Sequence, residues 1–255
     1  MRHFVLLLLF CCAWPARAGQ CVAESGAQTS VLVELYTSEG CSSCPPADRW
    51  LSSLGPRGYA PERVVPLALH VDYWDYIGWK DPYAKREFSL RQRKLTQLQR
   101  LALVYTPQVM LQGSDFRAWG TSAFDQAVAK INATPARAKL RLEIASVGRD
   151  AMDVRVMAQL LDPRHTEDAA LFLAAYENRL ESRVSAGENR GRTLTHDHVV
   201  LQWEGPLGFS ERKLVEQRRL PLLPKADPAR SGVVGFVQNR RTAEVLQALM
   251  LPACS

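Results

Sequence analysis

The apolar residues follow two different patterns along the chain, and the change comes near Pro135. Before that point, mostly apolar runs at 30–37 and 64–71 predict two buried strands. Between the runs, Trp50 and Leu54 stand at helical spacing ahead of a Gly-Pro turn, which predicts a helix. A strand, a helix and a strand joined by short links predict a βαβ unit with parallel strands.

The rest of the first half predicts two more helices and a short strand. A basic amphipathic helix follows Asp81, which can cap it, with Pro82 in its first turn. The segments 109–111 and 123–130 read as a short strand and a helix.

After Pro135, apolar and polar residues alternate. This alternation predicts half-buried strands in an antiparallel sheet or a small sandwich. The expected strands lie at 140–144, 152–156, 171–176, 198–203 and 233–237, and a helical pattern returns at 243–249.

The N-terminus has the three parts of a signal peptide. A basic head at Arg2 precedes an apolar run over 4–14, and Ala16-Arg17-Ala18 forms an Ala-x-Ala cleavage site. The run is about half of the ~20 residues that a membrane-spanning helix needs. The alternative is a buried N-terminal helix. We expect residues 1–18 to be removed and the rest to be exported, to the periplasm or the medium, with no stable membrane insertion.

The composition is that of a globular protein. The 255 residues are 47% hydrophobic and 23% charged, which excludes a disordered chain, a collagen-like fibre and a small disulfide-knotted toxin. The net charge of +6 is mild, so no nucleic-acid partner is predicted.

Export changes how the cysteines are interpreted. Signal cleavage would leave Cys21, Cys41, Cys44 and Cys254 in an oxidising compartment. Four cysteines allow three pairings. We favour a local Cys41–Cys44 bridge and a structural Cys21–Cys254 bridge, because chain termini often lie close together.

The main candidate for chemistry is Cys41-Ser42-Ser43-Cys44, at a strand end and a helix start. Free N–H groups and the positive end of a helix dipole stabilise a thiolate, so Cys41 is expected to attack. Cys44, one turn on, is within disulfide reach and would resolve the mixed disulfide.

Other residues are expected at the same edge, because both parallel strands end there. His70 ends the second strand, and an aromatic segment with Tyr73, Trp74 and Trp79 follows it. Thr106-Pro107 precedes the next strand and is a candidate cis bond facing the cysteines. We assign these residues to substrate positioning. The alternatives are a hydrogen-bonded structural histidine and aromatic packing between domains.

A strand, a Cys-x-x-Cys at a helix start and a Thr-Pro before a strand are similar to the thioredoxin fold. More closely, the chain resembles a secreted bacterial family catalogued as domain-of-unknown-function family 1223. The segments that carry this resemblance are Glu34–Asp48, His70–Asp75, Gly78–Pro82, Tyr105–Gln108, Gly187–Asn189 and Val237-Gln238.

The resemblance implies a thioredoxin-like domain with an added β-rich domain, and no settled activity. Unlike ordinary thioredoxins, the chain has no Trp before Cys41, carries Ser-Ser between the cysteines and inserts a long basic helix before Thr106. The predicted architecture is an α/β thioredoxin-like domain over residues 27–135, followed by a mainly antiparallel, sandwich-like β domain over residues 138–255.

The predicted function is thiol–disulfide exchange on exported proteins, through their thiols or disulfides, with an unknown redox recycling partner and no cofactor. The alternative is a non-enzymatic binding module in which Cys41–Cys44 is an inert structural disulfide. A zinc site would need two more ligands, such as His196 and His198, which lie in the other domain. No metal is predicted.

Overall fold

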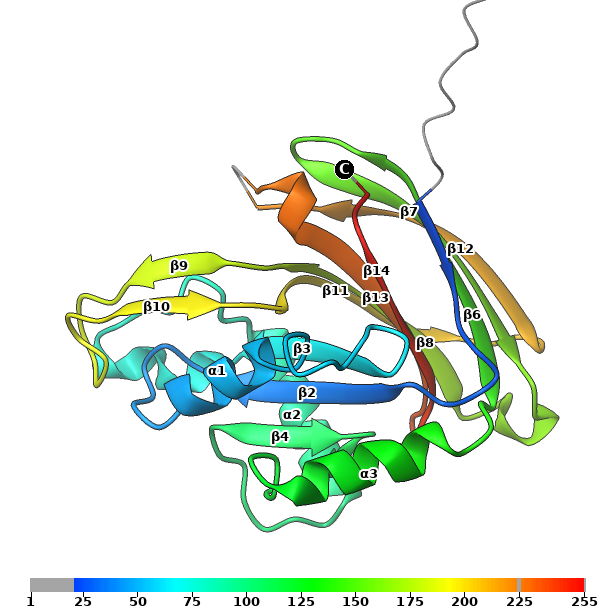
Figure 1. Cartoon of the computed structure of the whole chain (residues 1–255), viewed down its shortest axis with the longest axis horizontal. Helices are drawn as coiled ribbons and strands as arrows, with labels where there is room; N and C mark the ends of the chain where they lie inside the picture. Colours follow the sequence, from blue (N-terminus) through cyan, green and yellow to red (C-terminus); the bar gives the residue numbers. More distant parts are fainter. Residues whose placement is uncertain (1–20, 224–225, 255) are drawn as a thin grey trace, which may run out of the picture.

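A mixed eight-stranded sheet runs through the computed structural model, which describes residues 21–223 and 226–254 (Figure 1). Its order is β14-β13-β8-β11-β3-β2-β4-β5. The strands are β2 (Val31–Thr37), β3 (Val64–His70), β4 (Gln108–Leu111), β5 (Ser114–Asp115), β8 (Ala169–Glu177), β11 (Val199–Gly208), β13 (Ser231–Asn239) and β14 (Val245–Pro252).

A four-stranded antiparallel sheet packs against the β8–β13–β14 side of the large sheet. Its order is β1-β6-β7-β12, with β1 (Cys21–Glu24), β6 (Ala138–Val147), β7 (Ala151–Leu160) and β12 (Lys213–Pro221). Alternate residues such as Leu142 and Val156 point inward and share one core with Leu173 and Leu249. The predicted alternation therefore separates a buried face from a polar outer face.

Helices cover both faces of the β2–β4 region, so β2 is buried throughout, including its polar residues Glu34 and Thr37. Leu35 of β2 belongs to the core under α1 (Pro45–Ser52) and α3 (Ser122–Asn132). Its neighbour Tyr36 belongs to the core under α2 (Arg86–Leu98). In the described ranges there are also three short 3-10 segments: η1 (Asp72–Ile77), η2 (Pro163–His165) and η3 (Pro228–Arg230).

A separate hairpin extends from the large sheet. It consists of β9 (Leu180–Arg183) and β10 (Thr193–His196), and it lies beside α1 (Figure 1). The predicted parallel unit is present, since β2 and β3 pair in parallel with α1 between them.

The expected fold class, an α/β thioredoxin-like domain followed by a separate sandwich-like domain, is wrong. The part of the chain that the structure describes is mostly β, with 43% strand and 19% helix, in large mixed and antiparallel sheets. Strands from both halves share the eight-stranded sheet, because β11 pairs in parallel with β3. This pairing joins segments far apart in sequence, and local periodicity does not encode it.

The joint between the two halves of the sheet is narrow. Strands β3 and β11 share one register pair, Ala68 with Val199. The division into residues 27–135 and 138–255 stays a prediction. The expected signal peptide, residues 1–18, lies outside the described residues.

Two element predictions are wrong. The helix expected at 243–249 is strand β14, whose Leu249 and Met250 face different cores. A strand buried on both faces is apolar throughout, so its sequence has no clear period of two. The basic helix begins at Arg86, and Asp81 does not cap it.

Candidate functional site

The Cys41–Cys44 disulfide lies in the turn between β2 and α1, as predicted. The Cys44 carbonyl accepts the N–H groups of Ala47 and Asp48 at 2.9 and 3.1 Å, and two prolines occupy the first helical positions. Cys41 is 1% exposed and Cys44 is 0% exposed, whereas Ser42 and Ser43 between them are exposed. The sulfurs are therefore covered in the disulfide form.

Residues 184–192, which join β9 to β10, cover this turn, and we call them the cover loop. The Glu188 carboxylate accepts the Ser42 backbone N–H at 2.8 Å. The buried Asn189 amide donates to the carbonyls of Glu39 and Cys41 at 2.8 and 2.9 Å. Arg192 donates to the Asn189 side-chain oxygen at 2.7 Å. The sequence alone did not predict these contacts.

A cluster of ionisable side chains is buried beneath the cover loop. It consists of Glu39, Asp48, His70, Asp81 and His196, each less than a tenth exposed, and we call it the buried ionisable cluster.

Two pairs hold the cluster together. His70 Nδ1 lies 2.7 Å from Asp81 Oδ2, which also accepts the Glu39 N–H at 2.8 Å. His196 Nε2 lies 3.0 Å from Glu39 Oε1, and Trp79 donates its indole N–H to Glu39 Oε2 at 2.8 Å. The two imidazole rings pack edge to face at 4.9 Å. The cluster thus joins α1, β3, β10 and the segment after η1.

Burial and neighbouring charge shift the protonation of this cluster. Burial alone would lower the pKa of His70, but the Asp81 carboxylate raises it to about 8. Burial alone would raise the pKa of Asp81, but His70 holds it below its usual value. For Asp48, burial dominates and raises the pKa. Among the described residues, Asp48 Oδ1, His70 Nε2 and His196 Nδ1 have no hydrogen-bond partner.

The aromatic segment connects the cysteine turn to Thr106. The Trp74 indole donates to the Thr106 hydroxyl at 2.7 Å. A Cβ at Gly40 would lie 3.3 Å from Trp74 Cβ, so Trp74 packs on the residue before Cys41. The Thr106–Pro107 peptide is cis.

The predicted positioning residues do not all lie together. Trp74 and Thr106 meet near the cysteine turn, and Trp79 reaches the site through Glu39. His70 contacts Asp81, and the Tyr73 hydroxyl donates toward α2, to Gln92 at 3.1 Å.

Sequence reasoning missed four residues of this site and misread two. Glu39, Asp48, Glu188 and Asn189 received no role, Asp81 was assigned to a helix cap, and His196 was considered only as a zinc ligand. A signal for most of them existed, because all except His196 fall within the segments that carry the family resemblance.

The predicted Cys21–Cys254 bridge is present, with the Cα atoms 5.6 Å apart. It ties β1 to the residues after β14 and takes no part in the site.

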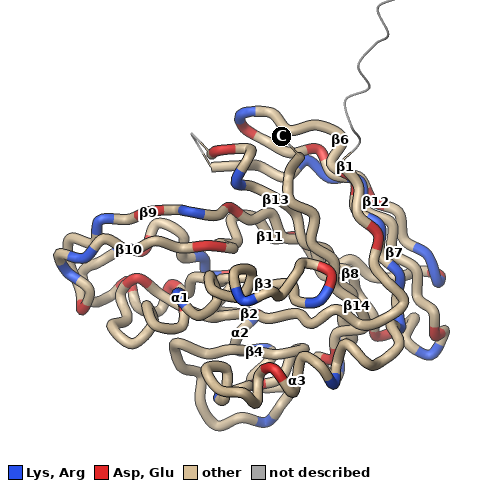
Figure 2. The backbone as a smooth tube through the Cα atoms, viewed as in Figure 1, with Lys and Arg blue, Asp and Glu red and all other residues tan. Residues whose placement is uncertain are grey.

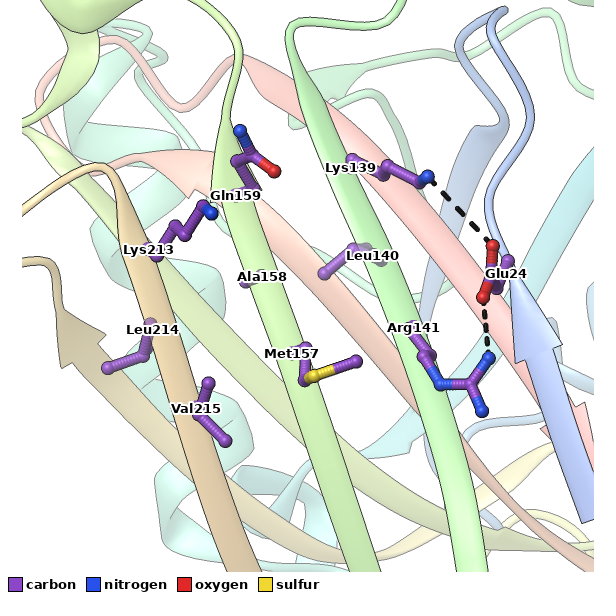
Figure 3. A pocket seen from close by; sticks show the side chains of 10 residues that line it. All are labelled: Glu24, Lys139, Leu140, Arg141, Met157, Ala158, Gln159, Lys213, Leu214 and Val215. Atoms are coloured by element: carbon purple, nitrogen blue, oxygen red, sulfur yellow. Dashed lines mark hydrogen bonds and ion pairs between the residues drawn. The ribbon is translucent and has the colours of Figure 1, made fainter.

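A cavity of about 260 Å³ lies away from this site, on the outer face of the four-stranded sheet (Figure 3). Its carboxylate, Glu24, pairs with Lys139 and Arg141. Both signs of charge occur along these outer strands (Figure 2).

Within residues 21–223 and 226–254, no group of three or more His, Cys, Asp or Glu side chains is arranged to hold a metal ion. None of the helices in that part of the chain is long and apolar enough to cross a membrane.

Two solved structures share this fold. Protein AGR_C_4864 from Agrobacterium tumefaciens is 23% identical, with a TM-score of 0.66, over 91% of this chain and 97% of that one. HBP35 of Porphyromonas gingivalis is 16% identical, with a TM-score of 0.66, over 89% of this chain and 76% of that one.

No curated protein matches the sequence. Residues 32–238 match a family model described as "Protein of unknown function (DUF1223)". The chain belongs to this family.

Proposed function

We propose that the protein is an exported thiol–disulfide oxidoreductase that acts on exported proteins through Cys41 and Cys44. The observation that carries the proposal is the buried ionisable cluster next to a disulfide between residues three apart. Buried groups with shifted pKa values and unpaired polar atoms are unfavourable for stability and concentrate at functional sites.

The two disulfides differ in what they can contribute to stability. In the chain-entropy model, a bridge across a separation of 233 residues stabilises by about 5.5 kcal/mol, and one across a separation of 3 by about 2 kcal/mol. The Cys21–Cys254 bridge has the span of a structural staple. The short span of Cys41–Cys44 favours a chemical role.

The proposed reaction cycle balances two electrons. In the reduced protein, the Cys41 thiolate attacks one sulfur of a substrate disulfide, and the other substrate sulfur leaves as a thiolate that takes a proton. The Cys44 thiol then loses its proton and attacks Cys41 Sγ, which releases the second substrate thiolate and restores the Cys41–Cys44 bond. The substrate is reduced, and the pair of cysteines is oxidised. The reverse steps oxidise a substrate dithiol.

The neighbouring residues are proposed to position the substrate. Trp74 and Thr106 are linked by a hydrogen bond beside the cysteine turn, and Pro107 follows. We propose the same role for His70, Tyr73 and Trp79, which would act through the packing of this region. An exported dithiol or disulfide partner would recycle the protein.

Export is part of the proposal. It is supported by the signal-peptide pattern of residues 1–18 and by the pairing of all four remaining cysteines in disulfides, which persist in oxidising compartments. Sequencing the N-terminus of the protein secreted by its host would show a start at Gly19. A retained Met1 would contradict export by this signal.

A redox titration tests the function. The protein would be equilibrated with glutathione, its thiols trapped, and Cys41 and Cys44 read by mass. An exchange enzyme should have a potential of roughly −120 to −270 mV. The Cys41→Ser variant, which cannot form this bridge, controls for thiols trapped elsewhere.

The burial of both sulfurs favours a second candidate, a non-enzymatic binding module in which the bridge is a staple. A potential below about −300 mV would support that candidate and contradict exchange.

A further inference from the structure

A cavity of about 310 Å³ lies between α2 and strands β8, β11 and β13. It belongs to the face of the large sheet that α2 covers, whereas α1 lies on the other face. The volume is at the lower end of the roughly 300–1,000 Å³ typical of small-molecule sites. Its apolar walls include Leu90, Leu98, Phe172, Trp203 and Pro206.

Arg91 lines this cavity and is fixed in place. Its side chain is 9% exposed. Its Nε donates to Glu34 Oε1 at 2.6 Å, and its Nη2 donates to Glu34 Oε2 at 3.0 Å and to Gln238 at 3.1 Å. The guanidinium carbon lies 4.7 Å from the ring centre of Trp203 and 5.0 Å from that of Phe172. The guanidinium group is therefore already held in place, so little side-chain entropy is lost when a ligand binds to it.

One nitrogen of this guanidinium remains available. Nη1 makes no hydrogen bond to any residue that the structure describes, although its neighbours Nε and Nη2 are both engaged. Arginine presents its donors in a planar fork that suits a carboxylate. Because Arg91 lines the cavity, Nη1 is the donor that remains for an anionic group bound there.

The charge around the cavity also favours an anion. Lys94 and Arg240 line it with exposed side chains. The single acidic lining residue, Glu87, lies 3.8 Å from Lys85. Glu34 neutralises Arg91, so Lys94 and Arg240 supply the net positive field.

The backbone departs from regular pairing at the cavity wall. The β8–β11 register shifts between Glu204 and Leu207. Gly205 has a φ of +120°, and a Cβ there would lie 2.8 Å from the Leu171 carbonyl. Such irregularities re-aim neighbouring side chains and are frequent beside binding sites. Here they flank Trp203 and Pro206.

We propose that this cavity binds a single-chain amphipathic carboxylate of the fatty-acid type. The acyl chain packs on the aromatic and leucine walls, and the carboxylate lies between Arg91 Nη1 and the Lys94–Arg240 rim. The proposal does not depend on the chemistry of Cys41–Cys44.

Titration calorimetry with octanoate, octylamine and octanol tests this assignment, because the three probes share a chain and differ in head group. Octanoate should bind at least about tenfold more tightly than either other probe. Lys94→Glu and Arg240→Glu should each weaken octanoate binding by about tenfold. The control is Arg86→Glu, which makes the same charge change on α2 outside the cavity. Arg91 is left intact, because its removal would leave Glu34 buried and unpaired.

No measurable binding of octanoate would overturn the proposal. So would equal binding of octanoate and octylamine, or octanoate binding that Arg86→Glu weakens as much as Lys94→Glu does. The last two results would indicate nonspecific adsorption or a general charge effect.

Discussion

His70 is completely buried, and its charge depends on Asp81. Since the folded pKa of about 8 lies above the ordinary value of 6.5, the folded protein holds the His70 proton more tightly than the unfolded chain does. The resulting stabilisation is fully present below pH 6.5 and is lost as the pH rises through 8. We predict that the free energy of unfolding falls by about 1.5 kcal/mol between pH 6.5 and pH 9 from this group.

Urea denaturation across this pH range measures the effect. His198, whose pKa burial lowers to about 4, is neutral in the folded protein over this range and loses its remaining proton only from the unfolded chain, which raises the free energy of unfolding by about 0.4 kcal/mol and slightly opposes the His70 effect. The His70→Gln variant should lose most of the slope. His165→Gln, in the η2 turn, should keep it. If the free energy of unfolding of His70→Gln depended on pH as strongly as that of the wild type, the His70–Asp81 pair would not govern this pH dependence.

The β9–β10 hairpin is the element whose loop contacts the cysteine turn. Asn189 ties the cover loop to two carbonyls of the cysteine turn, and its removal leaves both without that donor. We predict that Asn189→Ala speeds reduction of the Cys41–Cys44 bridge by dithiothreitol about tenfold, because the loop opens more often. Timed thiol trapping with mass readout measures the rate.

Arg190→Ala is the matched control, because Arg190 is exposed in the same loop and its side chain makes no hydrogen bond to the described residues. In Arg190→Ala, dithiothreitol should reduce the Cys41–Cys44 bridge at the wild-type rate. Equal rates for Asn189→Ala and wild type would show that the cover loop does not limit access.

Elements with a clear local pattern could be predicted from sequence, and strand β14, which is buried on both faces, could not. The β2–α1–β3 unit and the alternating strands β6 and β7 follow from local pattern. Strand β14 has buried residues on both faces, and its apolar residues fit a helix equally well. Asp81 resembles a helix cap by position, but tertiary contact with His70 determines its role.

At the scale of the whole molecule, long-range pairing decides the fold. The turn Cys41–Cys44 and its bridge could be predicted, because all its determinants lie within a few residues. The buried ionisable cluster could not, because Glu39 and His196 meet only when the hairpin folds over α1. The single large sheet likewise depends on the joining of β3 and β11.

The two disulfides should therefore affect global stability differently. Cys21→Ser/Cys254→Ser frees the two ends of the described chain and should lower the free energy of unfolding by about 2–5 kcal/mol. Cys41→Ser/Cys44→Ser opens a loop between residues three apart and should lower it by less, about 2 kcal/mol at most. Urea denaturation without reductant compares both variants with wild type.

The comparison also tests why Cys41–Cys44 is there. A larger loss for Cys41→Ser/Cys44→Ser than for Cys21→Ser/Cys254→Ser would mean that the short bridge is the main staple, and exchange would lose its support. A smaller loss, together with a potential above about −300 mV, would leave chemistry as the reason for this bridge beside the buried ionisable cluster.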